Sequence, residues 1–325
     1  MTPRYDYLAP VPDLSLLDES IDPSGARPKF SIVIPAFNEA DVIGDVVANV
    51  RETLGNSAEI IVVDDGSSDL TRMEAERAGA KVVALPVNGG NGAAIKTGIR
   101  NATGEFICFM DGDGQHTSED MLKLLEHAGP FDMVVGARNA KGQASFLRKV
   151  ANRFWNRLAS WMTGRKVEDL TSGFRVVRRT VAEEFLPLLP NGFSYPTTIT
   201  LSSMRAGYAV KYVPVDVRKR VGKSKIRLFR DGAKFFIIMF KITTLFSPIK
   251  IFLPLAGLPA LGAVAAAGAS IVGMANGWVI ATILFTSALS LTGLGLVSEQ
   301  ICAMRFERLT VMAESRRLRM SEVAR

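Results

Sequence analysis

The 325-residue chain is 48% hydrophobic and 22% charged, and this composition excludes a disordered or fibrous protein. Its length allows one substantial domain together with a smaller part. The formal net charge of +7 is uneven, because residues 205–250 hold twelve Lys or Arg against two Asp, a local balance of +10. Such a block predicts an anionic partner, either nucleic acid or a lipid surface.

Residues 1–28 are predicted to form a flexible leader. They contain five prolines and five acidic residues but no apolar segment, so they do not resemble a secretory signal. We therefore expect the folded domain that follows to lie in the cytoplasm.

Residues 29–222 are predicted to form one α/β domain, because strand-length apolar runs alternate with amphipathic helical stretches. We expect parallel strands joined by right-handed crossovers in the first part, and a mixed second half over residues 145–220. The predicted strands cover residues 30–34, 60–63, 81–85, 106–110 and 133–135, and the predicted helices cover residues 39–54, 69–78, 92–101 and 118–127.

Ligands bind at the carboxyl ends of the strands in such sheets. Three of the predicted strands end in polar, flexible sequences, at residues 35–39, 64–67 and 111–113. These three ends predict one shared cleft.

Asp111 and Asp113 end the most apolar of these strands, with Gly112 between them and Gly114 after them. Carboxylate oxygens are the ligands that Mg²⁺ and Mn²⁺ prefer, and the glycines allow both acids to face one ion. The pair therefore predicts a divalent metal site. The alternative is a solvated turn without a metal.

The other two strand ends, Asn38-Glu39 and Asp64-Asp65, carry groups that suit a nucleobase and ribose. The structural alternatives are a helix cap for Asn38 and a turn for Asp65. Residues 88–92 are glycine-rich and, with Lys96, resemble a phosphate cradle at a helix start. Their spacing is not that of a P-loop, which argues against ATP hydrolysis.

Residues 223–250 are predicted to contain a basic helix that lies on the membrane surface, because Lys and Arg alternate with apolar positions over residues 226–246. The alternative is a basic helix that covers the sheet. Residues 251–298 follow, and these 48 residues contain no charge.

This uncharged stretch predicts two transmembrane helices, at about residues 251–274 and 277–298, with a turn at Asn276-Gly277. Lys241 and Lys250 precede it, and several Arg residues follow it in the tail of residues 299–325, so both ends are predicted to be cytoplasmic. The stretch argues against a nucleic-acid binder. The alternative is a helical pair buried in a soluble core.

Six ordered motifs within residues 29–300 resemble the family 2 glycosyltransferases of GT-A fold, and more narrowly the polyprenyl-phosphate glycosyltransferases, the group that contains dolichyl-phosphate mannose synthase. The resemblance implies a Rossmann-like nucleotide-sugar-binding domain followed by an interfacial helix and a two-helix transmembrane hairpin. It implies inverting transfer from a UDP- or GDP-sugar to a polyprenyl phosphate, undecaprenyl or dolichyl, at the cytoplasmic membrane face. The motifs lie at residues 32–39, 62–67, 91–93, 111–116, 169–175 and 222–225.

The resemblance also implies roles for individual residues. Asp111, Asp113 and Gln115 would hold Mg²⁺ or Mn²⁺. The donor would be bound by Pro35, Ala36, Glu39, Asp64, Asp65, Lys96, Asp111 and Lys225, and the acting groups near the phosphates would be Asp113, Asp169, Arg138, Arg148 and Arg220. The chain departs from the family at Gly112 and Gly114, where Asp-Ala-Asp-Leu-Gln is frequent, and at residues 88–90, where a Lys-containing approach is usual.

A phosphate acceptor is already anionic at neutral pH, so the reaction needs no strong general base. Cations such as Arg138 and Lys225 would hold the two phosphate groups close together. For Asp169 two interpretations stay open, an orienting or basic group and a structural partner of Arg175. His116, next to the metal motif, is a candidate neighbour of the diphosphate.

Two other functions stay open. A membrane polysaccharide synthase shares the fold. Such synthases resemble one another in a Gln-x-x-Arg-Trp motif, and this motif does not occur in the sequence. A non-catalytic membrane adaptor that senses nucleotide sugars is the second, although both Asp111 and Asp113 argue against it. Assembly into a homo-oligomer is compatible with the sequence.

Overall fold

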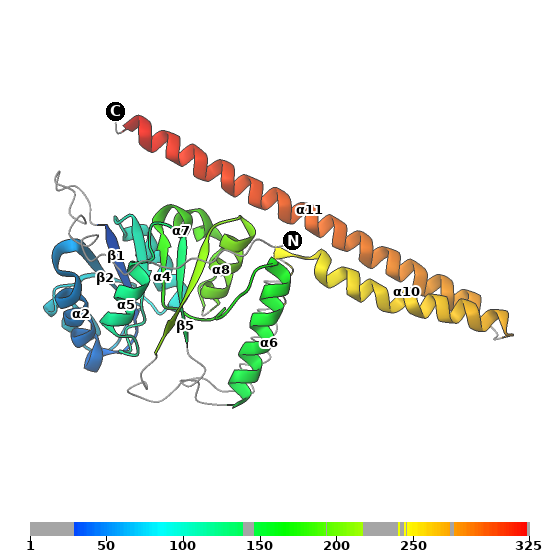
Figure 1. Ribbon diagram of the computed structural model, residues 1–325, viewed down its shortest axis with the longest axis horizontal. Helices are drawn as coiled ribbons and strands as arrows, with labels where there is room; N and C mark the ends of the chain where they lie inside the picture. Colours follow the sequence, from blue (N-terminus) through cyan, green and yellow to red (C-terminus); the bar gives the residue numbers. More distant parts are fainter. Residues whose placement is uncertain are drawn as a thin grey trace.

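An α/β domain and a long helical hairpin make up the computed structural model, which describes residues 29–138, 146–192, 194–216, 240, 244, 246–273 and 276–323 (Figure 1). The first half of the domain contains β1 (Phe30–Ala36), α2 (Ala40–Leu54), η1 (Gly55–Ser57), β2 (Ala58–Asp64), α3 (Thr71–Arg77), β3 (Lys81–Ala84), α4 (Asn91–Asn101), β4 (Phe106–Phe109), α5 (Ser118–Leu125) and β5 (Met133–Arg138). The second half contains α6 (Phe146–Thr163), β6 (Arg175–Arg178), α7 (Arg179–Phe185), η3 (Leu186–Leu188), α8 (Tyr195–Arg205) and β7 (Val210–Val215).

The strands form a single sheet of seven in the order β3-β2-β1-β4-β6-β5-β7. In its register, Phe30 of β1 lies beside Ala58 of β2 and Phe106 of β4. β6 runs antiparallel to both β4 and β5, whereas the other neighbouring pairs are parallel. The parallel pairs of β1 to β4 agree with the prediction for the first part, and the antiparallel β6 lies in the second half, which the sequence predicts to be mixed.

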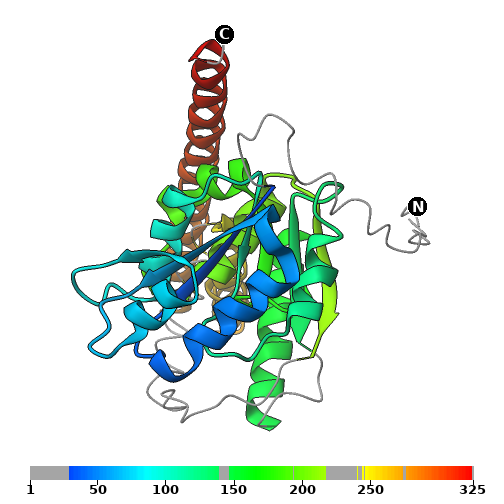
Figure 2. The same cartoon turned by 90° about the vertical axis from the view of Figure 1, so that its left-hand side faces the viewer.

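The alternation of side chains along the strands divides the core into two layers. Ile32 and Ile34 of β1 pack on one face, against helices that include α2 and α5. Val33 points to the other face and packs in the cluster that contains α4, α7 and α8. Figure 2 shows helices on both sides of the sheet. This covering of both faces explains why the strands read as continuous apolar runs in the sequence.

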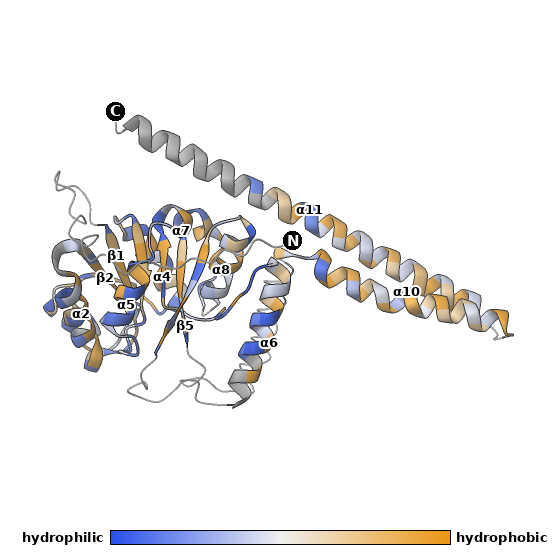
Figure 3. Cartoon of the chain, in the orientation of Figure 1, coloured by the Kyte–Doolittle hydropathy of each residue, from blue (hydrophilic) through white to orange (hydrophobic). Residues whose placement is uncertain are grey.

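The hairpin consists of α10 (Ile249–Ile271) and α11 (Gly277–Val323), and both are long and apolar enough to cross a membrane. The most apolar 18-residue segments of the two helices have a mean hydropathy of 1.8 and 1.9, and only 11% and 17% of these segments are buried. Figure 3 shows apolar residues along both helices. This exposure contradicts the alternative of a buried pair in a soluble core.

Small residues allow the two helices to approach closely. Ala256 and Ala263 of α10 are buried, as are Ala281 and Ala288 of α11. A Cβ added at Gly295 would lie 2.8 Å from Cβ of Phe252. The two helices of the hairpin therefore pack closely against each other.

The turn between the helices contains Asn276, with a φ of 63° in the left-handed region, at the position that the sequence predicts. α11 does not end near Ser298, where the second apolar span was expected to stop, but continues to Val323. Residues 296–323 contain neither Pro nor Gly, so nothing in the sequence interrupts the helix there.

Polar contacts join the hairpin to the α/β domain near the start of α10. Arg205 at the end of α8 donates to Oγ of Ser247 at 2.7 Å and pairs with Glu299 of α11 at 2.7 Å. Lys250 donates to the carbonyl oxygens of Trp161 and Met162 on α6, both at 2.8 Å. The described contacts therefore fix where the apolar helices leave the domain.

Candidate active site

The carboxyl ends of β1, β2 and β4 lie at one edge of the sheet, as predicted for the site. In the register, Pro35 lies beside Val63 and Ala36 beside Asp64. The backbone N–H of Asp65 donates to the carbonyl of Ala36 at 2.9 Å. The backbone of residues 35–36 and the two carboxylates of β2 are therefore neighbours.

Asp65 is buried and holds the glycine-rich loop. Its Oδ1 accepts a hydrogen bond from the N–H of Gly89 at 2.8 Å, and its Oδ2 accepts one from Gly90 at 2.9 Å. These two N–H groups were expected to form an open phosphate cradle, and here an acidic side chain of the protein uses them. Asp64, also buried, accepts from the N–H of Ser67 at 3.0 Å.

Lys96 lies on the first turns of α4 and donates to the side chain of Asn191. Residues 190–192 cover this helix start closely, since a Cβ at Gly90 would lie 2.7 Å from the carbonyl oxygen of Asn191. Burial, followed by the charge of Arg100, lowers the pKa of Lys96. The loop and the helix start thus pack against residues that are remote in sequence.

The loop of residues 38–39 is bonded to the one that follows β2. Asn38 has a φ of 54°, its N–H donates to Oγ of Ser67 at 2.9 Å, and its Oδ1 accepts from the N–H of Ser68 at 2.9 Å. Glu39 is the N-cap residue of α2, and its N–H donates to Thr71 at 2.9 Å. Asn38 is therefore not the helix cap that one interpretation predicted. It links two loops of the site.

The acidic motif after β4 turns sharply. Gly114 has a φ of 68°, a left-handed conformation that suits glycine, and the N–H of Gln115 donates to Oδ1 of Asp113 at 3.2 Å. Gly112 is equally confined, because a Cβ there would lie 3.2 Å from the carbonyl oxygen of Pro35. These contacts give a physical reason for the two glycines of this motif.

Asp111 faces the loop that precedes β6. A Cβ added at Gly173 would lie 3.3 Å from Oδ2 of Asp111 and 3.3 Å from the hydroxyl of Tyr195. Burial by itself would lower the pKa of Arg138, but the hydrogen bonds and charge of Asp169 raise it, and the negative charge of Asp111 adds to this increase. Asp111 therefore lies between the sheet edge and the Arg138 region.

His116 stacks on Phe174, with ring centroids 4.2 Å apart and an interplanar angle of 16°. Burial lowers its pKa to about 4, against an opposing effect of Asp113, so the imidazole is neutral at pH 7. Its Nδ1 is buried and has no hydrogen-bond partner among the residues that the structure describes. The ring packs beside the acidic motif.

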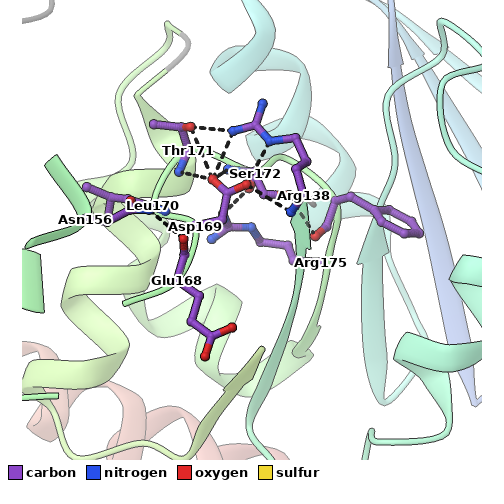
Figure 4. Close-up of polar contacts among 9 residues, drawn as sticks. Arg138, Asn156, Glu168, Asp169, Leu170, Thr171, Ser172 and Arg175 are labelled. Atoms are coloured by element: carbon purple, nitrogen blue, oxygen red, sulfur yellow. Dashed lines mark hydrogen bonds and ion pairs between the residues drawn. The ribbon is translucent and has the colours of Figure 1, made fainter. Parts of the chain in front are cut away.

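Asp169 and Arg138 form a bidentate ion pair at the end of β5 (Figure 4). Nε of Arg138 donates to Oδ2 at 2.8 Å and Nη2 donates to Oδ1 at 2.9 Å. Nη2 also donates to Oγ1 of Thr171 at 2.6 Å, and the N–H groups of Thr171 and Ser172 donate to Oδ1 of Asp169 at 3.1 Å. The Asp169 carboxylate is thus almost surrounded by donors.

These donors control the protonation of Asp169. Burial by itself would raise the pKa of this carboxyl group, but the hydrogen bonds and the charge of Arg138, with the backbone N–H groups, outweigh burial and lower it. A carboxylate with a lowered pKa is a weak base. The geometry therefore favours an orienting interpretation of Asp169 over a basic one.

Arg175 is not the partner of Asp169 that the sequence suggested. Its guanidinium is fully buried and donates to the carbonyl of Pro196 and to Oγ1 of Thr200, both at 2.9 Å, and to the carbonyl of Ser172. Arg175 points into the domain and joins the loop before β6 to α8. Arg138 reaches Asp169 because β5 ends beside that loop.

Three other predicted site residues cannot be assigned a contact. Arg148 lies on α6, with its side chain outside the part that the structure describes, and Arg220 and Lys225 lie outside the described residues altogether. The basic helix expected over residues 223–250 is also largely outside them. Among the described residues, no group of three His, Cys, Asp or Glu could hold a metal ion.

Several residues at this edge had no role in the sequence interpretation. They include Thr171, which shares Arg138 with Asp169, and Tyr195, whose hydroxyl faces Gly173. Thr171 lies inside the motif of residues 169–175, so the motif could have identified it as a site residue. Tyr195 and Asn191 belong to no motif, and only the packing of α8 and its preceding loop brings them here.

Known proteins resemble this chain in sequence and in fold. The profile of glycosyl transferase family 2 matches residues 31–186. Glycosyltransferase AglJ of Haloferax volcanii is 31% identical over 230 residues, which cover 68% of this chain and 74% of AglJ. Undecaprenyl-phosphate 4-deoxy-4-formamido-L-arabinose transferase of Klebsiella pneumoniae is 34% identical, over 51% of this chain and 56% of that protein. The chain thus spans little more than half of the second relative.

Among solved structures, glucosyl-3-phosphoglycerate synthase from Mycobacterium tuberculosis in complex with phosphoglyceric acid superposes with a TM-score of 0.57. The match covers 72% of this chain and 84% of that one at 20% identity. The same enzyme in complex with Mn²⁺, UDP and glucosyl-3-phosphoglycerate gives a TM-score of 0.54 at 20% identity, over 73% of this chain and 84% of that one. These likenesses confirm the predicted fold class.

Proposed function

Because the chain belongs to glycosyl transferase family 2, and is therefore a sugar-transferring enzyme, we propose that it moves a sugar from a nucleoside-diphosphate sugar to a polyprenyl phosphate at the membrane surface. One observation carries this proposal. The two apolar helices are fastened to the α/β domain through Arg205, Ser247 and Glu299, so the domain stays next to the lipid. An acceptor with a long apolar chain suits an enzyme held in this position.

The names of the relatives support the same acceptor. The Klebsiella pneumoniae relative is named as an undecaprenyl-phosphate transferase, although it matches over only 56% of its length. The solved structure with UDP supports a nucleotide-sugar donor, for which a UDP- or a GDP-linked sugar is proposed. The sugar and the carrier length are set by side chains that these likenesses do not identify.

We place both helices across the membrane, with the α/β domain and both ends of the hairpin on the cytoplasmic side. Lys250 at the start of α10 and the basic residues after Met304 support this orientation by the positive-inside rule. A reporter fused after Arg325 is expected to give a cytoplasmic signal. A signal from the opposite side of the membrane would refute this topology.

Asp111, Asp113 and Gln115 would hold a divalent ion, Mg²⁺ or Mn²⁺. Their oxygen donors suit such an ion, and because this motif supplies two carboxylates, oxygens of the donor diphosphate would complete the site. A bound ion would neutralise charge on the diphosphate leaving group. Solved relatives by fold contain Mn²⁺ or Mg²⁺ together with UDP, which supports this assignment.

In the proposed reaction, a phosphate oxygen of the acceptor attacks the anomeric carbon of the donor sugar. The bond from that carbon to the diphosphate breaks, the nucleoside diphosphate leaves with the electron pair, and the configuration inverts. The attacking oxygen is already anionic, since the second pKa of a phosphate monoester is about 6. No residue has to remove a proton, which agrees with the weakly basic Asp169.

Arg138 is the cation that this geometry offers to the phosphates. Its side chain is 32% exposed, whereas that of Asp169 is 7% exposed, so the guanidinium retains an open side while Asp169 fixes its direction. Asp169 is therefore a positioning residue in this proposal. Arg148, Arg220 and Lys225 are proposed as further cations at the phosphates from their motif positions alone.

Replacing Gly173 by Ala is expected to lower kcat/KM by about 10-fold, because the new Cβ would press on Asp111 and displacements well under 1 Å reduce the rate of positioned groups. The melting temperature should change little. Gly44→Ala on α2 is the matched control, since its nearest contact would be 3.9 Å away. Equal rates in both variants would show that Asp111 is not confined by Gly173.

The experiment that tests the function uses purified protein in lipid, a divalent ion and radiolabelled nucleotide sugars. Label is expected to move into the organic phase only when polyprenyl phosphate is present, and polyprenol without the phosphate should give none. A growing polymer would favour the polysaccharide synthase instead. Saturable binding of nucleotide sugar without turnover would favour the non-catalytic adaptor.

A further inference from the structure

We propose that His116 binds the phosphate of the acceptor, with its Nε2–H donating a hydrogen bond to a phosphate oxygen beside the guanidinium of Arg138. The inference rests on the proposed function, because it names a further group that holds the acceptor of that reaction. It also gives a role to a side chain whose packing is explained by the fold but whose nitrogen atoms are not.

The imidazole of His116 lies on a rigid surface between the acidic motif and the end of β5. It stacks on Phe174 with the ring centroids 4.2 Å apart. The Phe174 ring is itself confined, since a Cβ added at Gly136 would lie 2.9 Å from its Cδ1. Gly136 precedes Arg138 by two residues on β5. The stack therefore holds the imidazole near the strand end that carries Arg138.

Charged groups from both halves of the site act on this ring. Burial lowers the pKa of His116, the charge of Asp113 opposes this effect, and the charge of Arg138 adds to it. Asp120, in the first turn of α5, acts in the same direction as Asp113 but is paired with Lys123 at 2.8 Å. The ring is thus within range of the acidic motif and of the cation proposed at the phosphates.

The two nitrogens of the ring have different surroundings. Nδ1 is buried and has no hydrogen-bond partner among the residues that the structure describes. Nε2 also makes no hydrogen bond within that part of the chain, but it is accessible to solvent. A buried N–H without an acceptor is rarer than a buried bare nitrogen, so we assign the proton to Nε2. The ring therefore offers an accessible N–H donor.

Packing does not account for a histidine at this position. A phenylalanine would make the same stack on Phe174 and would leave no buried nitrogen without a partner. What the imidazole adds is its accessible N–H, for which the described residues provide no acceptor. An oxygen of a ligand is the partner that would complete this hydrogen bond.

A phosphate oxygen of the acceptor suits this donor. The phosphate is anionic at neutral pH and accepts strong, charge-assisted hydrogen bonds. Arg138, whose side chain is 32% exposed, offsets the charge, while the neutral N–H of His116 orients the group without adding a second cation. His116 keeps its proton throughout, because the attack of the phosphate oxygen on the sugar requires no proton transfer.

Two substitutions in the full-length protein separate this role from packing. His116→Phe keeps the stack and removes the donor. His116→Gln removes the aromatic ring but keeps an N–H close to the position of Nε2. His127→Gln is the matched control, because His127 is the other histidine of the chain and lies in the turn that follows α5.

The variants are compared with the nucleotide sugar that the unchanged protein transfers. His116→Phe is expected to raise the KM for polyprenyl phosphate and to lower kcat/KM for it by roughly 10- to 100-fold, the range for a lost hydrogen bond to a charged group. The KM for the nucleotide sugar and the melting temperature should not change. His116→Gln should lose less than His116→Phe, and His127→Gln should lose nothing. A smaller folded fraction would change neither KM.

Full activity of His116→Phe would overturn this assignment, and so would a lower activity of His116→Gln than of His116→Phe, which would indicate a packing role. A raised KM for the nucleotide sugar in place of the acceptor would overturn it as well. In each of these cases the unchanged protein still makes the glycolipid. No transfer by the unchanged protein would overturn the proposed function, and this assignment with it.

The tautomer provides a check that does not depend on turnover. In the His127→Gln background His116 is the remaining histidine of the chain, so ¹⁵N NMR of histidine-labelled protein in lipid reports on this ring. Nε2 is expected to carry the proton, and its resonance should shift when polyprenyl phosphate is added without nucleotide sugar. A proton on Nδ1, or an Nε2 resonance that polyprenyl phosphate leaves unchanged, would overturn the assignment.

Discussion

Replacing Asp113 by Asn is expected to lower the rate of sugar transfer at least about 100-fold, because a neutral amide is a poor ligand for a divalent ion and no longer offsets its charge. The fold should be kept, since the N–H of Gln115 can still donate to the amide oxygen at this position. Transfer of labelled sugar to lipid, measured over a range of Mn²⁺ concentrations, checks the prediction.

Asp41→Asn is the matched control for this change, because Asp41 is exposed on α2 and its substitution removes the same charge. Its rate should equal that of the unchanged protein. A partial return of activity at high Mn²⁺ in Asp113→Asn would agree with a weakened metal site. Undiminished activity at low Mn²⁺ would show that Asp113 is not a ligand.

Replacing Arg138 by Met is expected to abolish transfer and to lower the free energy of unfolding by about 3 kcal/mol, because it leaves the buried Asp169 carboxylate without its partner. The partial exposure of Arg138 keeps this loss at the lower end for a broken buried pair. Denaturant unfolding and the lipid-transfer assay measure the two effects separately.

The double variant Arg138→Met with Asp169→Asn separates catalysis from stability. Removing both charges should recover most of the lost free energy of unfolding but none of the activity. Recovery of activity in the double variant would contradict the role of Arg138 at the phosphates. A stability equal to that of Arg138→Met alone would show that the two side chains are not coupled.

The lowered pKa of Asp169 gives the pH dependence a definite sign. A carboxyl group whose pKa is lower in the folded state stabilises the fold above its unfolded value of about 3.9, and this stabilisation is lost as the pH falls through the folded value. The difference in unfolding free energy between the unchanged protein and Asp169→Asn should therefore shrink below about pH 4.

Much of the fold could be predicted because its elements repeat simple patterns. Strands β1, β2 and β4 are short apolar runs, and the polar motifs around Asn38, Asp64 and Asp111 identify their carboxyl ends. The 48 uncharged residues identify the hairpin by length alone. The family resemblance of the motifs is confirmed by the profile match and by AglJ.

The remaining features depend on contacts between distant residues. The antiparallel β6 has the same apolar character as its neighbours, so its direction cannot be read from Arg175 to Arg178. The sequence offered only Arg175 as a structural partner of Asp169. The actual partner, Arg138, is 31 residues away in the chain and is brought there by the position of β5 in the sheet. The use of Gly89 by Asp65 likewise needs two loops folded together.

The measurement that tests the central claim most directly is the structure of the lipid product, determined by mass spectrometry and by ¹H–³¹P NMR. Purified protein with nucleotide sugar, Mn²⁺ and polyprenyl phosphate is expected to give one sugar in a phosphodiester with the lipid, with the anomeric configuration opposite to that of the donor. A product without a bond between sugar and lipid phosphate, or one that retains the donor configuration, would contradict the account.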